Sequence, residues 1–249
     1  MSDVDIKALF EAGAHFGHKT SRWHPKMAQY IHSKRGGVHI IDLAKTVPML
    51  DEALAFIEKE VASGKQVLLV STKKQMQESL LEVAQSTKMP YVTNRWLGGM
   101  LTNANTMNAR VKHLKDLEAR MESGELANKY NKLEVQRFQE EIDAMNELYL
   151  GVKHMAARVG VVFVLDILAD KNAVAEANKL NIPVVALVDT NTDPSDIKYP
   201  IPCNDDSLKA VKLILDEVKK AIEAGQGASA KNSDEVSADK QAKAEETKE

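Results

Sequence analysis

The chain has 249 residues, 44% of them hydrophobic, so it can bury a substantial core. Its formal net charge of -3 at pH 7 argues against a protein that binds a polyanion such as nucleic acid over its whole surface. It contains no apolar run of about eighteen residues and begins MSDVDIKALF, which predicts a cytosolic protein without a membrane span or secretory leader. Its single cysteine, Cys203, excludes an internal disulfide and a thiolate metal cluster.

Short elements are predicted at the start of the chain. Apolar residues at helical spacing predict a helix around Leu9, ended by Gly13 and Gly17. The segment HFGHKTSRWHPKM holds no period and is predicted to be a loop. YIHSKRGGVHIID predicts a hairpin with a basic tip, and Asp42 can cap a helix that runs to about Ala62.

Strands and helices then alternate. The apolar runs QVLLVS, GVVFVLD and PVVALVD predict strands covered on both faces, and Tyr91 and Val92 predict a short one. Helices are expected from about Lys74 to Thr87, from about Asn172 to Leu180 and, after KYPIPC, from about Ser207 to Ala224. This alternation predicts an α/β fold with a mostly parallel sheet flanked by helices and right-handed crossovers.

A long segment interrupts the alternation between the strands at Tyr91 and Val161. It far exceeds the crossover of about a dozen residues that parallel strands require. Two apolar stripes mark helices in it, Met107, Val111, Leu114 and Met121, then Phe138, Ile142, Met145 and Tyr149. Residues 103–150 are therefore predicted to form an antiparallel helical hairpin inserted into an α/β domain of residues 1–102 and 151–224.

The C-terminal residues 225–249 contain one large aliphatic residue, Val236. Such a segment cannot bury enough apolar surface to offset the entropy of ordering. We expect a disordered tail.

Motifs for catalysis are weak. Neither a dinucleotide-binding GxGxxG nor a phosphate-binding P-loop is present. STKKQ either holds a phosphate with Lys73 and Lys74 or is an ordinary capped helix start. DTNTDP and NDD place Asp189 and Asp205 at the carboxyl edge of the sheet, where they either bind a divalent cation or serve turns and caps. A flavin or nucleotide enzyme is the weaker hypothesis, and we expect neither catalytic residues nor an organic cofactor.

Basic residues gather where acids are missing, because no Asp or Glu lies between Ala12 and Ile41. RNA contact needs cations for phosphates and rings or guanidinium planes for bases, and this stretch interleaves both. The predicted RNA-binding residues are His18, Lys19, Arg22, Trp23, Lys26, Lys34, Arg35, Lys73, Lys74, Arg95, Arg110 and Lys112. The alternatives are a solvated basic face with tryptophans as core lids, or a scaffold that binds only proteins through the hairpin.

Four blocks together resemble one family: EAGAHFGHKTSRWHPKM, YVTNRWLGGMLTN, VVFVLDILADKNAVAEANKLNIPVVALVDTNTDP and YPIPCNDD. In order and spacing, from about Ile6 to Ala224, they resemble the bacterial small-subunit ribosomal protein two family. The resemblance implies a flavodoxin-like parallel sheet flanked by helices, with an inserted coiled-coil hairpin. It also implies a structural component of the small ribosomal subunit that has no enzymatic activity.

The resemblance further implies binding to small-subunit ribosomal RNA where head meets body, and a part in docking ribosomal protein one. The chain would then lie in the cytoplasmic ribosome among other small-subunit proteins, as a single copy and away from membranes. NRWLGGMLTN would join body and hairpin: Trp96 and Leu97 pack the base, the glycines turn the chain, and Arg95 meets a phosphate. Four residues would organise the sheet's edge or a bound ion: Asp189, Asn191, Asp205 and Asp206.

Overall fold

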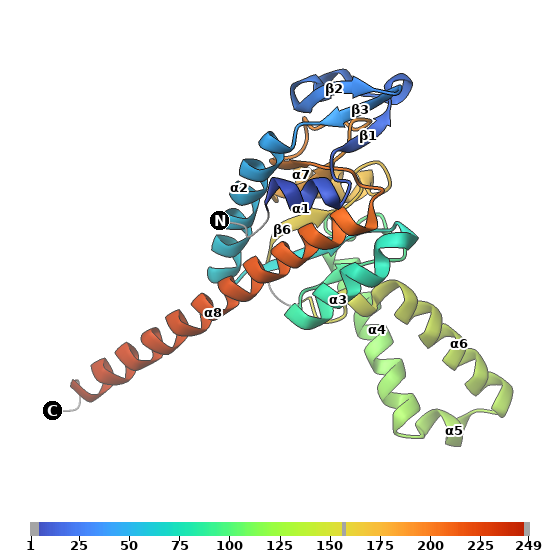
Figure 1. The fold of residues 1–249 in the computed structure, drawn as a ribbon. Coiled ribbons are helices and arrows are strands. Elements are labelled where there is room, and N and C mark those ends of the chain that lie inside the picture. Colours follow the sequence, from blue (N-terminus) through green and yellow to red (C-terminus); the bar gives the residue numbers. More distant parts are fainter. Residues whose placement is uncertain (1–4, 156–157, 247–249) are drawn as a thin grey trace.

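A parallel five-stranded sheet forms the body of the molecule in the structure, a computed structural model that describes residues 5–155 and 158–246 (Figure 1). Its order is β5-β4-β6-β7-β8, and every neighbouring pair is parallel. The strands are β4 (Gln66–Val70), β5 (Tyr91–Val92), β6 (Val159–Val164), β7 (Val184–Val188) and β8 (Tyr199–Pro202). The predicted α/β fold is confirmed.

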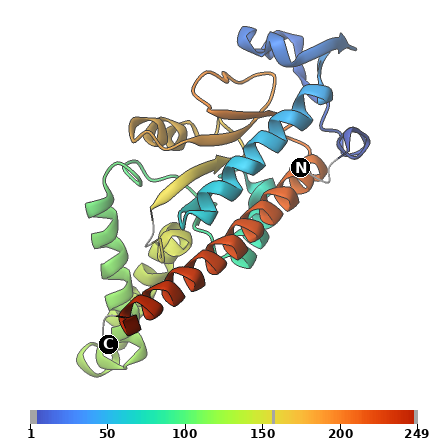
Figure 2. The same ribbon diagram turned by 90° about the vertical axis from the view of Figure 1, so that its left-hand side faces the viewer.

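Helices cover both faces of this sheet, which explains the continuous apolar runs. In β4, Val67 and Leu69 face the cluster formed with α2 (Leu43–Ala62), α3 (Gln77–Thr87) and α8 (Leu208–Glu246), while Leu68 and Val70 face the cluster that includes α7 (Lys171–Lys179). Figure 2 shows α2 and α8 side by side on one face. As predicted, the Asp42 carboxylate caps α2 by accepting a hydrogen bond from the Ala44 amide.

The strand β8 was not predicted from KYPIPC. Its prolines, Pro200 and Pro202, lack amide donors and argue against a strand in the middle of a sheet. β8 instead occupies the edge beside β7, where one side of the strand needs no partner.

A second, antiparallel sheet of three strands lies at one end of the body (Figure 1). It has the order β1-β3-β2, with β1 (Phe16–Lys19), β2 (Ile31–Arg35) and β3 (Val38–Ile41), and follows the short helix α1 (Ile6–Glu11). The predicted hairpin, β2 and β3, is confirmed. The loop predicted around Phe16–Lys19 is wrong, because these residues gain their regularity from pairing with β3, a contact that local sequence does not reveal. The turns η1 (Thr20–Arg22) and η2 (Pro25–Tyr30) lead from β1 to β2.

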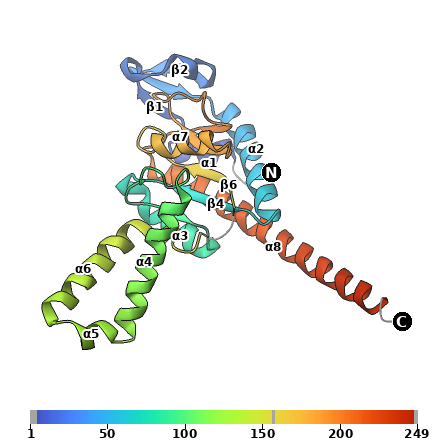
Figure 3. The same cartoon turned by 180° about the vertical axis from the view of Figure 1, so that it is seen from behind.

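Three helices project from the opposite end of the body (Figures 1 and 3). They are α4 (Ala104–Glu122), α5 (Glu125–Lys129) and α6 (Lys132–Tyr149), followed by η4 (Leu150–Val152). Most of the predicted stripe residues meet, together with Leu117, in one small apolar cluster of Leu114, Leu117 and Ile142, with Met121, Phe138, Met145 and Tyr149 packed against it. Met107 instead packs against the cluster that includes α7. α5 at the far end was not predicted. Coiled-coil geometry stays a prediction.

The last helix continues well past Ala224, where we expected it to end, and reaches Glu246. This differs from the predicted disordered tail over residues 225–246, while residues 247–249 lie outside the described part. None of the helices in the described ranges is long and apolar enough to cross a membrane.

Candidate nucleic-acid interface

The small sheet is fastened to the carboxyl edge of the main sheet. The His18 amide donates to the Thr190 hydroxyl at 2.8 Å, and the His24 amide donates to the Thr190 carbonyl at 2.7 Å. Gly17 lies against the same residue, since a Cβ added to Gly17 would sit 2.5 Å from Thr190 Cγ2. The position of every cation on this small sheet therefore depends on close contact with the β7–β8 loop.

The variant Gly17→Ala should lower the free energy of unfolding by about 1–3 kcal/mol, the usual cost of overpacking a tight site. The reason is that Thr190 is fully buried and cannot move aside without losing its hydrogen bonds. Gly98→Ala is the matched control, because a Cβ there meets nothing within 4 Å. Urea unfolding checks this, and equal midpoints for both variants would contradict the close contact.

Four cations surround the free end of the small sheet, which we call the basic tip: Lys19, Arg22, Lys34 and Arg35. All four are exposed, and within the described residues none forms an ion pair. The tip is compact, because Lys19 and Arg35 both pair with Val38 and the Thr20 amide donates to the Gly37 carbonyl at 3.0 Å. These side chains are free to meet phosphates.

Lys26 differs from the basic tip. Its ammonium lies 2.9 Å from the Asp193 carboxylate and donates to the Ser195 hydroxyl at 2.7 Å. The hydrogen bond from Lys26, and to a smaller extent those from Ser195, hold the pKa of Asp193 below its usual range. Lys26 therefore clamps η2 to the β7–β8 loop, and RNA contact through it stays a prediction.

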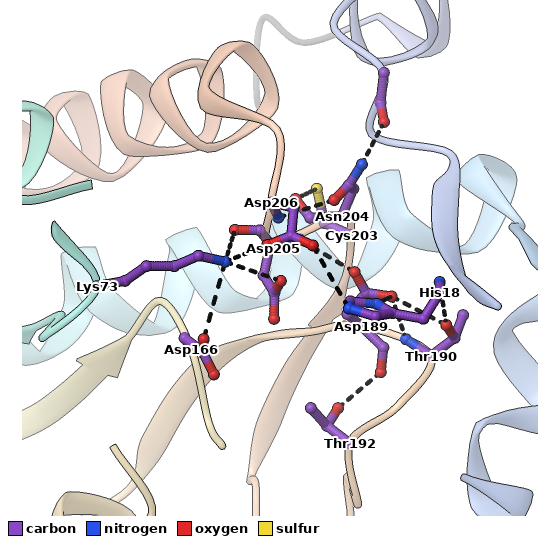
Figure 4. A network of polar contacts seen from close by, with 11 residues as sticks. His18, Lys73, Asp166, Asp189, Thr190, Thr192, Cys203, Asn204, Asp205 and Asp206 are labelled. Carbon is purple, nitrogen blue, oxygen red and sulfur yellow. Dashed lines mark hydrogen bonds and ion pairs between the residues drawn. The ribbon is translucent and has the colours of Figure 1, made fainter. Parts of the chain in front are cut away.

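Acidic side chains converge at the carboxyl edge of the main sheet around one lysine and one histidine (Figure 4). The group consists of Asp166, Asp189, Asp205, Asp206, Lys73 and His18. The Lys73 ammonium lies 2.5 Å from Asp206 Oδ1 and 3.5 Å from Asp205 Oδ1. Lys73 thus points into a cluster of carboxylates. Its predicted contact with RNA or phosphate stays a prediction.

His18 completes this cluster from the small sheet. Its Nδ1 lies 3.2 Å from Asp189 Oδ1, although the two atoms are not aligned for a hydrogen bond, and its Nε2 lies 3.5 Å from Asp206 Oδ2. The adjacent Asp189 carboxylate, which outweighs the opposing effect of burial, raises the pKa of His18. His18 therefore links the two sheets electrostatically.

Negative charge is in excess here. Burial, followed by the nearby Asp189 and Asp166 carboxylates, raises the pKa of Asp205 to about 7, while Lys73 lowers the pKa of Asp206. One ligand atom each from His18, Asp189 and Asp205 lie within 4.8 Å of one another, and such a nitrogen and oxygen set suits a divalent cation. These three residues are the ones that could hold a divalent cation, one of the two alternatives left open for this edge by the sequence.

Stability should fall as pH rises from about 5 to 8. In the folded chain Asp205 keeps a proton that the unfolded chain, with a pKa near 3.8, releases earlier, and His18 likewise binds its proton more tightly when folded. Each group's contribution is full below its unfolded pKa and is lost as pH passes its folded pKa. The slope is at most about 1.4 kcal/mol per pH unit for each proton.

Urea unfolding at several pH values, with a chelator present, measures this slope. Asp205→Asn mimics the protonated acid and should flatten the profile. An unchanged slope in that variant would remove Asp205 as the cause.

The remaining predicted RNA-binding residues lie apart from the basic tip. Lys74 is exposed where η3 (Lys74–Met76) begins, Arg95 is exposed next to the hairpin base, and Arg110 and Lys112 are exposed on α4. None of them forms an ion pair with another described residue. Arg110 and Lys112 are thus separated from the basic tip, because α4 projects from the end of the body opposite the small sheet (Figures 1 and 2).

The two tryptophans have different surroundings. Trp96 is only 7% exposed and packs with Met100 and Leu101, as predicted for the base of the hairpin. Trp23 is 39% exposed, and its ring lies 5.2 Å from the ring of His39 at an angle of 42°.

Sequence reasoning missed Glu176 on α7. Its Oε1 accepts hydrogen bonds from Trp96 Nε1 at 3.0 Å and the Gly99 amide at 2.7 Å. Its Oε2 accepts from the Leu101 amide and from the Thr102 amide and hydroxyl, each at 3.1 Å. Burial alone would raise the pKa of Glu176, but these donors outweigh it and lower the pKa. One carboxylate therefore organises the whole segment that joins body and hairpin.

Comparison with known proteins identifies the family. A family described as Ribosomal protein S2 matches residues 9–225, a span that contains the basic tip, the acidic cluster and Glu176. The chain belongs to the ribosomal protein S2 family. Members of the S2 family are structural proteins of the ribosome and not enzymes, which agrees with the weak catalytic motifs.

Relatives of the S2 family match over nearly the whole chain. The "Small ribosomal subunit protein uS2" of Roseiflexus sp. (strain RS-1) is 49% identical over 223 residues, 90% of this chain and 85% of that protein. Its namesake from Dehalococcoides mccartyi (strain ATCC BAA-2266 / KCTC 15142 / 195) is 46% identical over 228 residues, 92% of this chain and 93% of that protein. The one from Chloroflexus aggregans (strain MD-66 / DSM 9485) is 46% identical over 218 residues, 88% of this chain and 91% of that protein.

Proposed function

We propose that the chain is a structural constituent of the small ribosomal subunit, active in translation, that binds small-subunit ribosomal RNA through the basic tip. The main support for RNA binding is the basic tip itself. Its four cations are exposed and have no carboxylate partners among the described residues, although the chain as a whole has a net charge of -3. The relatives' name, small ribosomal subunit protein, supports the same assignment.

A second RNA contact is proposed on the hairpin, through Arg95, Arg110 and Lys112. The tip and the hairpin lie at opposite ends of the body, so one molecule can touch two separate RNA elements (Figure 1). This arrangement supports a site between the head and the body of the subunit. Phosphate contacts of this kind position a protein on RNA without reading sequence.

Sedimentation tests the assignment. A tagged copy of the full chain, expressed in a bacterial host, should run with small subunits in a sucrose gradient of the lysate at low salt and be released progressively as the salt concentration rises. The small-subunit fraction is separated from large subunits by its lower sedimentation rate. Recovery only at the top of the gradient would contradict the proposal.

Ribosomal protein one is the proposed protein partner, docked where α1 leads into β1. Phe10 and Phe16 support a protein contact there, since they are 58% and 51% exposed and both rings contact His15. The double variant Phe10→Ala/Phe16→Ala should enter small subunits normally but reduce the amount of protein one that sediments with them. An unchanged amount would count against this surface.

A further inference from the structure

We propose that the basic tip binds the phosphate backbone of double-helical RNA and not an unpaired strand. The inference rests on the proposed function and names the form of RNA that the same surface takes. Three features of the described residues support it: the placement of the cations, the open turn between them, and the engagement of the nearby rings.

The cations leave the tip from different faces of the small sheet. Lys19 and Arg35 are both in register with Val38, so their side chains leave the same face of the small sheet, two strand spacings or about 10 Å apart. Lys34 pairs with His39 and leaves the opposite face. Arg22 follows β1 in η1, which the Thr20 amide ties to Gly37. This layout suits a rigid partner that carries phosphates on its outside.

The turn between β2 and β3 consists of Gly36 and Gly37 and carries no side chains. Gly36 and Gly37 have φ values of +60° and +77°, and a Cβ on either would meet nothing within 4 Å. Their amides donate to no group in the described chain. A sugar-phosphate backbone can therefore approach closely and accept hydrogen bonds from the two amides.

Rings near the tip are already in contact with the protein. The ring of Trp23 lies 5.2 Å from the ring of His39, and only 39% of Trp23 is exposed. Recognition of unpaired RNA depends on rings that are free to stack on bases, whereas a duplex hides its bases and displays its phosphates. His32 on β2 is exposed, so the experiment includes it.

Fluorescence anisotropy with the full chain tests the inference, using a fully paired RNA hairpin and an oligouridine of equal length over a range of salt concentrations. The paired RNA should bind at least about tenfold more tightly. Lys34→Ala/Arg35→Ala should weaken that binding about tenfold and make the plot of log affinity against log salt shallower by about 1.4 to 1.8, the loss of two phosphate contacts.

Two further variants serve as controls. Lys59→Ala/Lys179→Ala removes two exposed cations from the last turns of α2 and α7. Trp23→Leu/His32→Ala removes the rings near the tip. Each double variant should change the affinity for the paired RNA less than about twofold. All variants must first unfold at the same urea concentration as the parent. Equal or tighter binding of oligouridine, or a loss in the ring variant as large as in the cation variant, would overturn the inference. Failure of the proposed function is distinguishable, because the parent chain would then be absent from small subunits.

Discussion

Replacing Glu176 with alanine is expected to lower the free energy of unfolding by about 3 kcal/mol, the largest effect of any single substitution considered. The variant leaves three part-buried donors without their acceptor, each at a cost of about 1–3 kcal/mol, and such losses are only partly additive. Trp96 and the Leu101 amide are the most enclosed of the donors that would lose their acceptor.

The expected consequence of Glu176→Ala is local as well as global. The helices α4 to α6 should lose their fixed orientation, because the segment from Trp96 to Thr102 is held by this carboxylate. Hydrogen exchange should then increase first in residues 96–102. Urea unfolding gives the total effect and hydrogen exchange gives its location.

Two other variants make this test specific. Glu176→Gln keeps the shape of the side chain but offers only one acceptor oxygen, so it should fall between the parent and Glu176→Ala. Glu52→Ala removes an exposed carboxylate from α2 that has no ion pair among the described residues, and it should change stability by less than about 0.5 kcal/mol. Equal stability of the alanine variants at positions 176 and 52 would refute the role given to Glu176.

Removal of the basic tip should have the largest effect on assembly. The variant with alanine at Lys19, Arg22, Lys34 and Arg35 should fold normally, since these exposed side chains form no ion pair that the structure describes. Its occupancy in small subunits should fall at least about tenfold in competition with the parent chain. The salt dependence of RNA binding should become shallower by about three, reflecting four lost phosphate contacts.

Lys26→Ala provides a contrast within the same region. Because Lys26 is paired with Asp193, its loss should lower stability rather than remove a phosphate contact. The pair is exposed, so the expected change is below about 1 kcal/mol. Competition between tagged parent and variant chains during subunit assembly, followed by quantification in the small-subunit fraction, measures both cases. Full occupancy of the variant with four alanines would show that the protein binds RNA through residues outside the basic tip.

The body of the fold was predictable because its strands are buried on both faces. Runs such as QVLLVS leave no polar face, and the segments between them have apolar residues at helical spacing. Strands joined by helices in this way run parallel to one another. β1 and β8 escaped prediction for opposite reasons. β1 is regular only through pairing with β3, and β8 contains two prolines that its edge position tolerates.

The candidate site was predictable in composition but not in arrangement. A stretch without acids pointed to cations, yet Lys19 and Lys26 look equivalent in sequence and differ only because Asp193, far along the chain, reaches one of them. Glu176 gave no signal, since a glutamate among alanines and lysines on a short helix is typical of a solvated face. Its role arises from five donors supplied by a segment about eighty residues earlier.

A structure of the assembled small subunit that contains this chain tests the central claim most directly, through the distances from Lys19 Nζ, Lys34 Nζ and the Arg35 guanidinium to the nearest RNA phosphate oxygens. The account predicts contacts of about 2.7–3.2 Å to paired RNA at the tip. A tip that faces solvent in the assembled particle would contradict it.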